Sequence, residues 1–401
     1  MAMPLHTVKK PVIRESKTIA LKELCHGIFA CFAHVFLSFT GGSMKVGSWF
    51  LTSALFVTSA LFVGFNQKGI AQVPHAEKLS QNMFLGVTPF PEECGLVRSQ
   101  LAFHPESASF DPDNALWLEF ASRLAGAEPP VAHEFLFRQG FPYLRVIEDT
   151  QAQMRVLVFS NDESITVAFR NSQYPRNWFG EYGDFNYVQQ DAAPLGFAGK
   201  VHEGFYSALM SVYPRVKAAV QTMQNAAQSK PVFLAGHSLG GALAVLTASQ
   251  FELQGVPVRA IYTAGQPRIG DALFIGQLDP LLGAKLFRIV DDQDVVPRLP
   301  PPAVAAASFA EVISKIGVQK HYASSKFENL NYVHFGNVIS LHSKTERIPL
   351  TQVPFADADD VAYWNALSAR LNARPPQGAF GSLLAMVGEH FTAKYVCQLV
   401  P

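Results

Sequence analysis

The turn formed by residues 236–240, Gly-His-Ser-Leu-Gly, constrains the fold of this chain more than any other stretch. The apolar run 232–235 before it predicts a buried strand, and the small-residue run 241–251 after it predicts a buried helix. A strand that turns this sharply into a helix needs glycine at both ends of the turn, because side chains there would clash with neighbouring backbone. The pattern predicts a nucleophile elbow with Ser238 as the nucleophile. The alternative is a glycine-rich helix start that packs tightly and does no chemistry.

Apolar, strand-like runs recur along the chain at 154–159, 165–169, 232–235, 258–265 and 285–290. The first two form a predicted hairpin around a polar turn at 161–162. The later runs alternate with helical patterns, such as the one from 205 to about 227. Strands that alternate with helices indicate a mostly parallel central sheet with helices on both faces, the α/β class.

Composition excludes several classes of function. The 401 residues are 49% hydrophobic and have a formal net charge of +0, so no excess of basic residues favours nucleic acid. The four cysteines lack zinc-type spacing, and no glycine-rich nucleotide-binding motif is present. We therefore expect no metal, no organic cofactor and no nucleic-acid partner.

The N-terminal part of the chain differs from the rest. Residues 46–67 form an uncharged, largely apolar run that is long enough to cross a bilayer, and basic residues precede it. We interpret 1–71 as a leader that holds a signal peptide or a membrane anchor, with Met44 as an alternative start to Met1. The alternative is a buried hairpin or core helix. The polar, proline-containing stretch 72–92 is a predicted linker before a domain at 93–401.

Several blocks, in this order, carry a resemblance to a known family. They are Ala-Phe-Arg-Asn-Ser at 168–172 with Arg-Asn-Trp at 176–178, Val-His-Glu-Gly-Phe at 201–205, the elbow itself, Ala-Gly-Gln-Pro-Arg-Ile-Gly at 264–270, and Asp-Val-Val-Pro-Arg-Leu-Pro at 294–300. Together they resemble the class 3 lipases, which include filamentous-fungal triacylglycerol lipases. The resemblance implies an α/β-hydrolase fold with a short lid. The family usually has Gly where this chain has Asn171, and a segment at about 301–328 looks inserted.

Ester hydrolysis by Ser238 needs an acid that orients a base, and N–H donors for the oxyanion. The strand at 285–290 runs into Asp291, Asp292 and Asp294, and the residues alone do not choose among them. The resemblance selects Asp294.

Two further groups of residues would complete the site. One oxyanion donor is the N–H of Leu239, the residue after the nucleophile, and the resemblance assigns the other to Ser172. Trp178 and Phe179 are expected in a lid that opens at a lipid surface. The alternatives are a strand-end turn role for Ser172 and a core position for Trp178.

Four histidines follow Asp294, and each preserves the order of serine, acid and histidine: His321, His334, His342 and His390. The segment around His390 resembles the family's terminal Asp-His block, although Glu389 replaces the Asp. We predict that His390 is the base, bonded to Asp294 through one ring nitrogen and to Ser238 through the other. His334 resembles a structural block of the family. His202 and His237 are expected to be structural as well.

The cysteines beyond residue 67 are Cys94 and Cys397, one at each end of the predicted domain. An extracytoplasmic enzyme would oxidise them if they meet in space, so we expect a disulfide between them. The alternative is a pair of unrelated buried thiols.

The sequence thus predicts a serine-dependent hydrolase of lipid esters that acts at a lipid–water interface. Its catalytic domain is expected outside the cytoplasm, either secreted or anchored to a membrane. Three alternatives stay open: a non-catalytic protein of this fold used as a binding or signalling scaffold, a phospholipase or galactolipase, and a feruloyl-type esterase.

Overall fold

The computed structural model describes residues 94–96, 101–172, 187–224, 229–315, 331–341, 351–352, 357–373 and 390–400. The expected leader, its apolar run at 46–67 and the expected linker at 72–92 lie outside the described residues, as do Trp178, Phe179, His321 and His342. No helix in the described ranges combines the length and the apolar character that crossing a membrane requires.

The centre of the fold is a sheet of eight strands in the order β1-β2-β3-β6-β7-β9-β11-β12. The strands are β1 (Tyr143–Asp149), β2 (Met154–Ser160), β3 (Ile165–Phe169), β6 (Val232–His237), β7 (Val258–Ala264), β9 (Leu286–Asp291), β11 (Asn337–Leu341) and β12 (Thr351–Gln352). From β3 to β11 neighbouring strands are parallel, whereas β1, β2 and β12 pair antiparallel. The expected α/β-hydrolase architecture, with a mostly parallel sheet, is confirmed.

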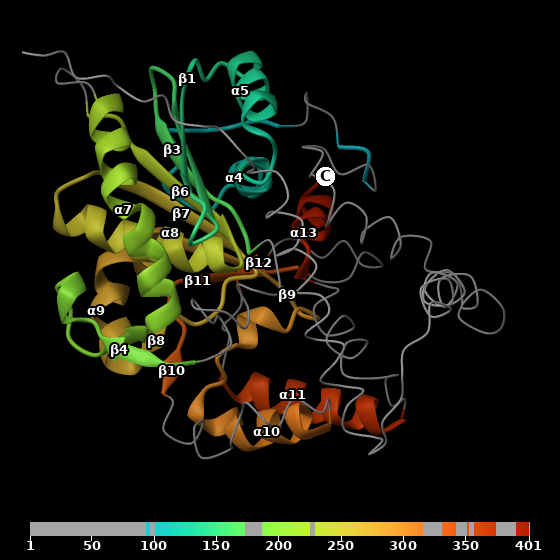
Figure 1. Ribbon diagram of the computed structural model, residues 1–401. Coiled ribbons are helices and arrows are strands. Elements are labelled where there is room, and N and C mark those ends of the chain that lie inside the picture. The colour runs from blue at the N-terminus through green and yellow to red at the C-terminus, as the bar shows by residue number, and fades with distance from the viewer. Residues whose placement is uncertain are drawn as a thin grey trace, which may run out of the picture. The chain divides into compact units, whose positions relative to one another are not determined.

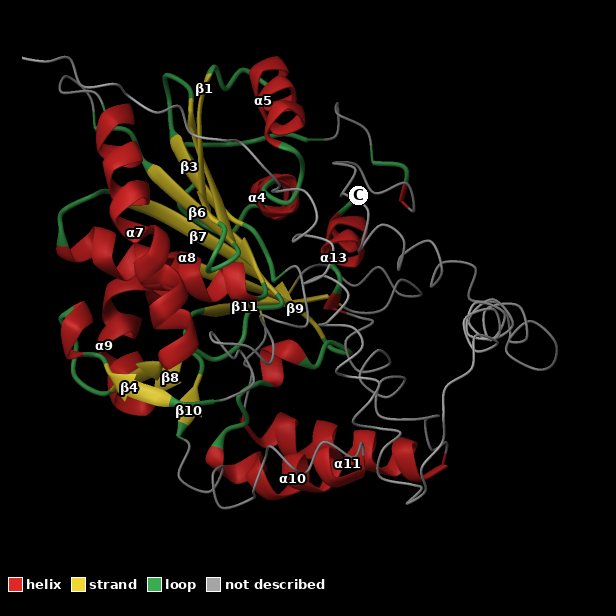
Figure 2. Ribbon diagram, viewed as in Figure 1, coloured by secondary structure: helices red, strands yellow, loops and turns green. Residues whose placement is uncertain are grey.

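Helices cover both faces of this sheet, as Figures 1 and 2 show. On one face lie α4 (Pro112–Leu124), α5 (Pro129–Arg138) and α13 (Thr392–Leu399), and on the other lie α7 (Glu203–Met223), α8 (Leu239–Leu253) and α9 (Ala272–Leu282). Side chains alternate along β6, so Phe233 packs with α4 and Leu234 packs with α8. Because both faces are buried, the strand is apolar throughout rather than alternating.

A second, small antiparallel sheet lies beside the first (Figure 2). Its strands, in the order β10-β8-β5-β4, are β4 (Gln189–Asp191), β5 (Lys200–His202), β8 (Gly270–Asp271) and β10 (Tyr332–Val333). The sequence did not predict this sheet. Strands of two or three residues are too short to show a period-2 pattern.

The segment expected as an insertion at about 301–328 contains the helix α10 (Ala306–Lys315). This helix packs beside α11 (Asp357–Ala373), as Figure 1 shows, and the Phe309 and Trp364 rings meet at 4.9 Å between centroids. Both rings share an apolar cluster with Val295 and Val296, which lie in the loop after β9. The helix pair therefore packs against the loop that carries Asp294.

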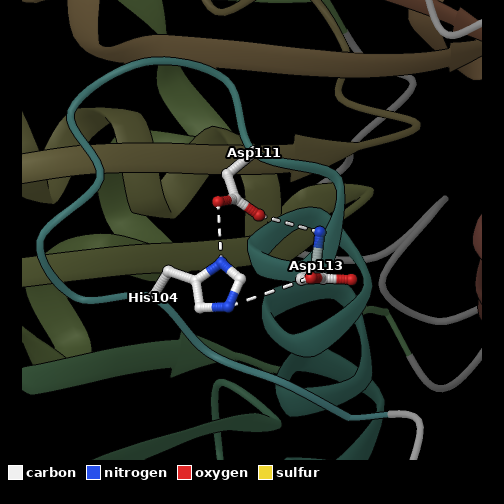
Figure 3. Close-up of side chains that lie close together, drawn as sticks. All are labelled: His104, Asp111 and Asp113. Atoms are coloured by element: carbon white, nitrogen blue, oxygen red, sulfur yellow. Dashed lines mark hydrogen bonds and ion pairs between the residues drawn. The ribbon is translucent and has the colours of Figure 1, made fainter.

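Helix α4 begins with a side-chain cap, drawn in Figure 3. Asp111 Oδ1 accepts the N–H groups of Asp113 and Asn114 at 2.9 and 3.1 Å, and Asp111 Oδ2 lies 2.9 Å from His104 Nδ1. The hydrogen bond and the charge of Asp111 raise the pKa of His104. Among the described residues, His104, Asp111 and Asp113 bring three possible metal-ligand atoms within 4.8 Å of one another, and their hydrogen bonds account for the group as a helix cap.

A disulfide joins Cys94 to Cys397, with 5.2 Å between the two Cα atoms. It ties the start of the described domain to α13, next to α4. The expected pairing is therefore present in the structure, and it closes a loop whose ends are 303 residues apart in sequence.

Replacement of both cysteines, Cys94→Ala with Cys397→Ala, is expected to lower the midpoint of thermal unfolding by roughly 10 °C. In the chain-entropy model a cross-link over so long a loop contributes about 5 kcal/mol, mainly by restricting the unfolded chain. Calorimetry measures the midpoint. As a control, a reducing agent should lower the wild-type midpoint to that of the variant and leave the variant unchanged. Free thiols at both positions in denatured, unreduced protein would refute the bond.

Candidate active site

Ser238 occupies the turn between β6 and α8 in a conformation that non-glycine residues seldom adopt, with φ 58° and ψ −128°. Such a backbone costs roughly 1–3 kcal/mol and persists only where its surroundings hold it. Here the Ser238 N–H donates to the Ala264 carbonyl at 2.9 Å. Such a strained serine between a strand and a helix is typical of a nucleophile elbow.

The glycines of the elbow are required by close backbone contacts. A Cβ at Gly236 would lie 2.0 Å from the Gly240 carbonyl oxygen, and a Cβ at Gly240 would lie 2.6 Å from the Phe169 carbonyl oxygen. The end of β3 therefore passes directly against the first turn of α8. Any side chain at either position would force strand and helix apart.

The same contact brings together the two segments that carry the expected oxyanion donors. Leu239 is the first residue of α8, so its N–H belongs to the turn that has no acceptor within the helix. Ser172 is half-buried and follows Arg170, whose carbonyl lies 2.8 Å from a Cβ built on Gly240. The strand that leads to Ser172 thus runs beside the elbow that holds Leu239.

Asp294 and His390 form a buried pair. Asp294 Oδ2 lies 2.6 Å from His390 Nδ1, and Asp294 Oδ1 accepts the Val296 N–H at 2.8 Å. A carboxylate only accepts, so Nδ1 carries the proton and donates it, which leaves Nε2 as an acceptor. This tautomer is the one that a general base needs.

The expected hydrogen bond between Ser238 and His390 is not formed. Within the described residues, His390 Nε2 is buried and has no hydrogen-bond partner. The pair of Asp294 and His390 is therefore assembled, while the contact with the serine is open. Catalytic hydrogen bonds are often long or poorly aligned until substrate binds, and they tighten in the complex. This tendency explains why the Ser238–His390 bond that was expected from the sequence is open in the structure.

Tyr395 also binds Asp294, a contact that no sequence pattern predicted. Its hydroxyl donates to Asp294 Oδ2 at 2.6 Å and accepts the Asp291 N–H at 3.1 Å. Burial and the charge of Asp294 raise the pKa of Tyr395 well above its usual value, so the hydroxyl keeps its proton. The signal in the sequence was an aromatic residue shortly after His390, in α13.

The other two aspartates of the loop have different partners. Asp291 Oδ2 accepts from Gln398 Nε2 at 2.8 Å, and Asp292 Oδ1 accepts from the Ser340 hydroxyl at 2.9 Å. Asp291 therefore holds α13 against the end of β9. Of the three candidates, Asp294 is the one whose carboxylate meets His390.

Three other histidines were expected to be structural, and each makes local contacts. His202 Nδ1 accepts the Gly204 N–H at 3.1 Å at the start of α7, and His334 Nε2 donates to the Pro297 carbonyl at 2.6 Å. Burial lowers the pKa of His334 and of His237, so both rings stay neutral. The His237 ring packs against His390, with 4.6 Å between centroids.

Gly265 provides the space in which the acid and the base meet. Its φ is +58°, and a Cβ at this position would lie 2.7 Å from His390 Cε1 and 2.9 Å from Asp294 Oδ2. The sequence block that contains Gly265 was recognised, but the residue itself was not assigned a role. Only a glycine satisfies both the backbone angle and the close approach.

Gly265→Ala is expected to lower kcat/KM for a soluble ester by about 100-fold, because the added methyl group displaces both members of the pair from their geometry. The matched control is Gly255→Ala, since Gly255 has a φ of +72° and nothing within 4 Å of its Cβ position. Both variants carry the backbone penalty, and only one carries the clash. Equal loss of activity in the two variants would show that backbone strain alone is responsible.

The family model described as Lipase (class 3) matches residues 166–304. This region contains β3, the elbow, Gly265 and Asp294. It ends before α10 and before α13, which follows His390.

Among curated proteins, the chain is similar to the secreted mono- and diacylglycerol lipase 1 of Fusarium solani, with 36% identity over 35% of this chain and 40% of that protein. It is also similar to the lipase of Rhizomucor miehei, at 33% identity over 39% and 43% of the two chains. A phospholipase A1-II 4 of Oryza sativa subsp. japonica matches at 31% identity over 35% and 41%. The chain spans about two fifths of the length of these relatives.

Solved structures of fungal lipases are similar over more of the chain. The lipase from Rhizopus microsporus var. chinensis matches with a TM-score of 0.46 and 18% identity, over 76% of this chain and 96% of that chain. A propeptide complex of Rhizomucor miehei lipase matches with a TM-score of 0.45 and 21% identity, over 79% and 94%.

Proposed function

We propose that this chain, whose residues 166–304 match the family model described as Lipase (class 3), is a serine hydrolase of lipid carboxylic esters. The observation that carries the proposal is the buried hydrogen bond between Asp294 and His390, formed beside the strained serine of the elbow. A scaffold that only bound lipids would not need a strained serine next to a correctly protonated imidazole.

In the proposed reaction, Ser238 Oγ attacks the ester carbonyl carbon while His390 Nε2 takes the hydroxyl proton. The carbonyl oxygen becomes an oxyanion, which the Leu239 N–H and Ser172 stabilise. His390 then gives its proton to the leaving alcohol, and the acyl group stays on Ser238. Asp294 stabilises the imidazolium through the Nδ1 hydrogen bond.

Water then resolves the acyl-serine. His390 Nε2 takes a proton from the water, whose oxygen attacks the acyl carbon, and the proton is returned to Ser238 Oγ as the carboxylic acid leaves. These steps use only the side chains and backbone groups of this chain. Val296, Tyr395 and His390 all donate to Asp294, which fixes its carboxylate against the imidazole.

The proposal places the enzyme outside the cytoplasm, acting on acylglycerols at a lipid–water interface. Its support is the disulfide, which persists in oxidising compartments, together with the similarity to a lipase named as secreted. Residues 1–71 as a removable or membrane-embedded leader, 72–92 as a linker, and Trp178 and Phe179 as lid residues remain predictions.

Ser238→Ala is expected to lose at least 1,000-fold in ester turnover, because the nucleophile is gone while the binding surface and the fold remain. The measurement is hydrolysis of a panel that contains a triacylglycerol, a diacylglycerol, a phospholipid, a galactolipid and a feruloyl ester. A fluorophosphonate probe should label the wild type and leave the variant unlabelled. A wild type that neither turns over any ester nor takes the label would favour the non-catalytic scaffold.

His390→Ala is expected to abolish both turnover and labelling, because it removes the imidazole nitrogen that is proposed to take the serine proton. The matched control is His334→Ala, which removes a buried imidazole bonded to a backbone carbonyl and should reduce stability more than turnover per folded molecule. If the His334 variant is inactive and the His390 variant is active, the base has been assigned to the wrong histidine.

A further inference from the structure

A single buried carboxylate on α11 neutralises two buried arginines. Asp360 Oδ1 accepts from Arg298 Nη1 at 2.8 Å, and Asp360 Oδ2 pairs with Arg268 Nη2. The Asp360 and Arg268 side chains have no exposed surface, and that of Arg298 is 8% exposed. Each carboxylate oxygen therefore holds a different arginine, and both ion pairs are shielded from water.

The two arginines belong to the two loops that build the acid–base pair. Arg298 ends the short helical turn at Val296–Arg298 that follows Asp294, and its N–H donates to the Val295 carbonyl at 3.0 Å. Arg268 lies three residues after Gly265, and its N–H donates to the Leu299 carbonyl at 2.7 Å. Asp360 thus joins the loop that carries Asp294 to the loop that contains Gly265.

Helix α11 contacts the acid loop through a second residue on the same face. The Tyr363 hydroxyl donates to the Gln293 carbonyl at 3.2 Å, and the Arg298 guanidinium lies 4.2 Å from the centre of the Tyr363 ring. Gln293 directly precedes Asp294. One turn of α11 therefore holds the acid loop on both sides of the carboxylate that binds His390.

A third buried arginine lies close to this group. Arg288 is buried near the same group, and burial together with the charge of Arg268 lowers the pKa of Arg288 to about 9, while Asp360 acts in the opposite direction. Without the Asp360 charge, three guanidinium groups would repel one another beneath the acid loop. The loop would then move to separate them, and Asp294 would move with it.

We propose that Asp360 is a positioning residue that fixes the geometry of Asp294 and His390, an inference that rests on the proposed function. It acts through Arg298 and Arg268 and touches neither substrate nor the reacting atoms. Helix α11 lies beyond residues 166–304, so the proposed positioning residue comes from a part of the chain outside the matched family region.

The test is Asp360→Asn in the full-length chain, with turnover normalised to the number of active sites titrated by a fluorophosphonate. We expect kcat per titrated site for a soluble short-chain ester to fall at least tenfold, with KM changed less than twofold, because binding is kept and proton transfer is misaligned. Asp360→Glu restores the charge and should recover at least part of kcat. A purely structural role would reduce the number of titratable sites without changing turnover per site.

The matched control is Asp359→Asn, which removes one negative charge from the neighbouring, exposed position of the same helix and should keep kcat and KM. Tyr363→Phe is the second variant, in case Asp360→Asn does not fold. It removes only the hydroxyl that holds Gln293 and should lower kcat per site several-fold. The inference is overturned if Asp360→Asn folds and its kcat per site stays within twofold of the wild-type value. If Asp360→Asn does not fold, the same result for Tyr363→Phe overturns it. A wild type without ester turnover would instead overturn the proposed function.

Discussion

The site depends on how the Asp294 carboxylate is hydrogen-bonded. Three donors from three places in the chain meet it: the Val296 N–H in its own loop, the Tyr395 hydroxyl in α13, and the ring of His390. A buried carboxylate is costly unless its oxygens are bonded, so this group of donors stabilises the charge and fixes the ring in one tautomer. The same bonds hold α13 to the end of β9, which makes the site part of the packing of the fold.

Much of the fold could be predicted because its strongest determinants are local. The apolar strand, the glycine turn and the small-residue helix of β6 and α8 are contiguous in sequence, and each leaves a clear pattern. The hairpin β2–β3 and the strands β7 and β9 were found in the same way. The short strands of the second sheet were not predicted, because their pairing depends on partners distant in the chain.

The candidate site was predictable to the extent that its residues lie in recognisable blocks. Ser238 and Asp294 belong to such blocks, and His390 was chosen among four histidines by resemblance. Gly265, Tyr395 and Asp360 were missed because their roles are set by distances between segments that no sequence pattern reports. The missing bond between Ser238 and His390 is a difference of another kind, since sequence cannot predict how closely two side chains approach each other.

The distribution of these groups along the chain has a consequence for the timing of activity during synthesis. The elbow lies in the middle of the chain, whereas the proposed base and the Tyr395 hydroxyl come from residues 390–400. At the usual rate of translation, many seconds separate the emergence of these two parts. A nascent chain therefore carries Ser238 before the proposed base His390 has been made, so any reaction that needs both residues must wait until α13 has docked.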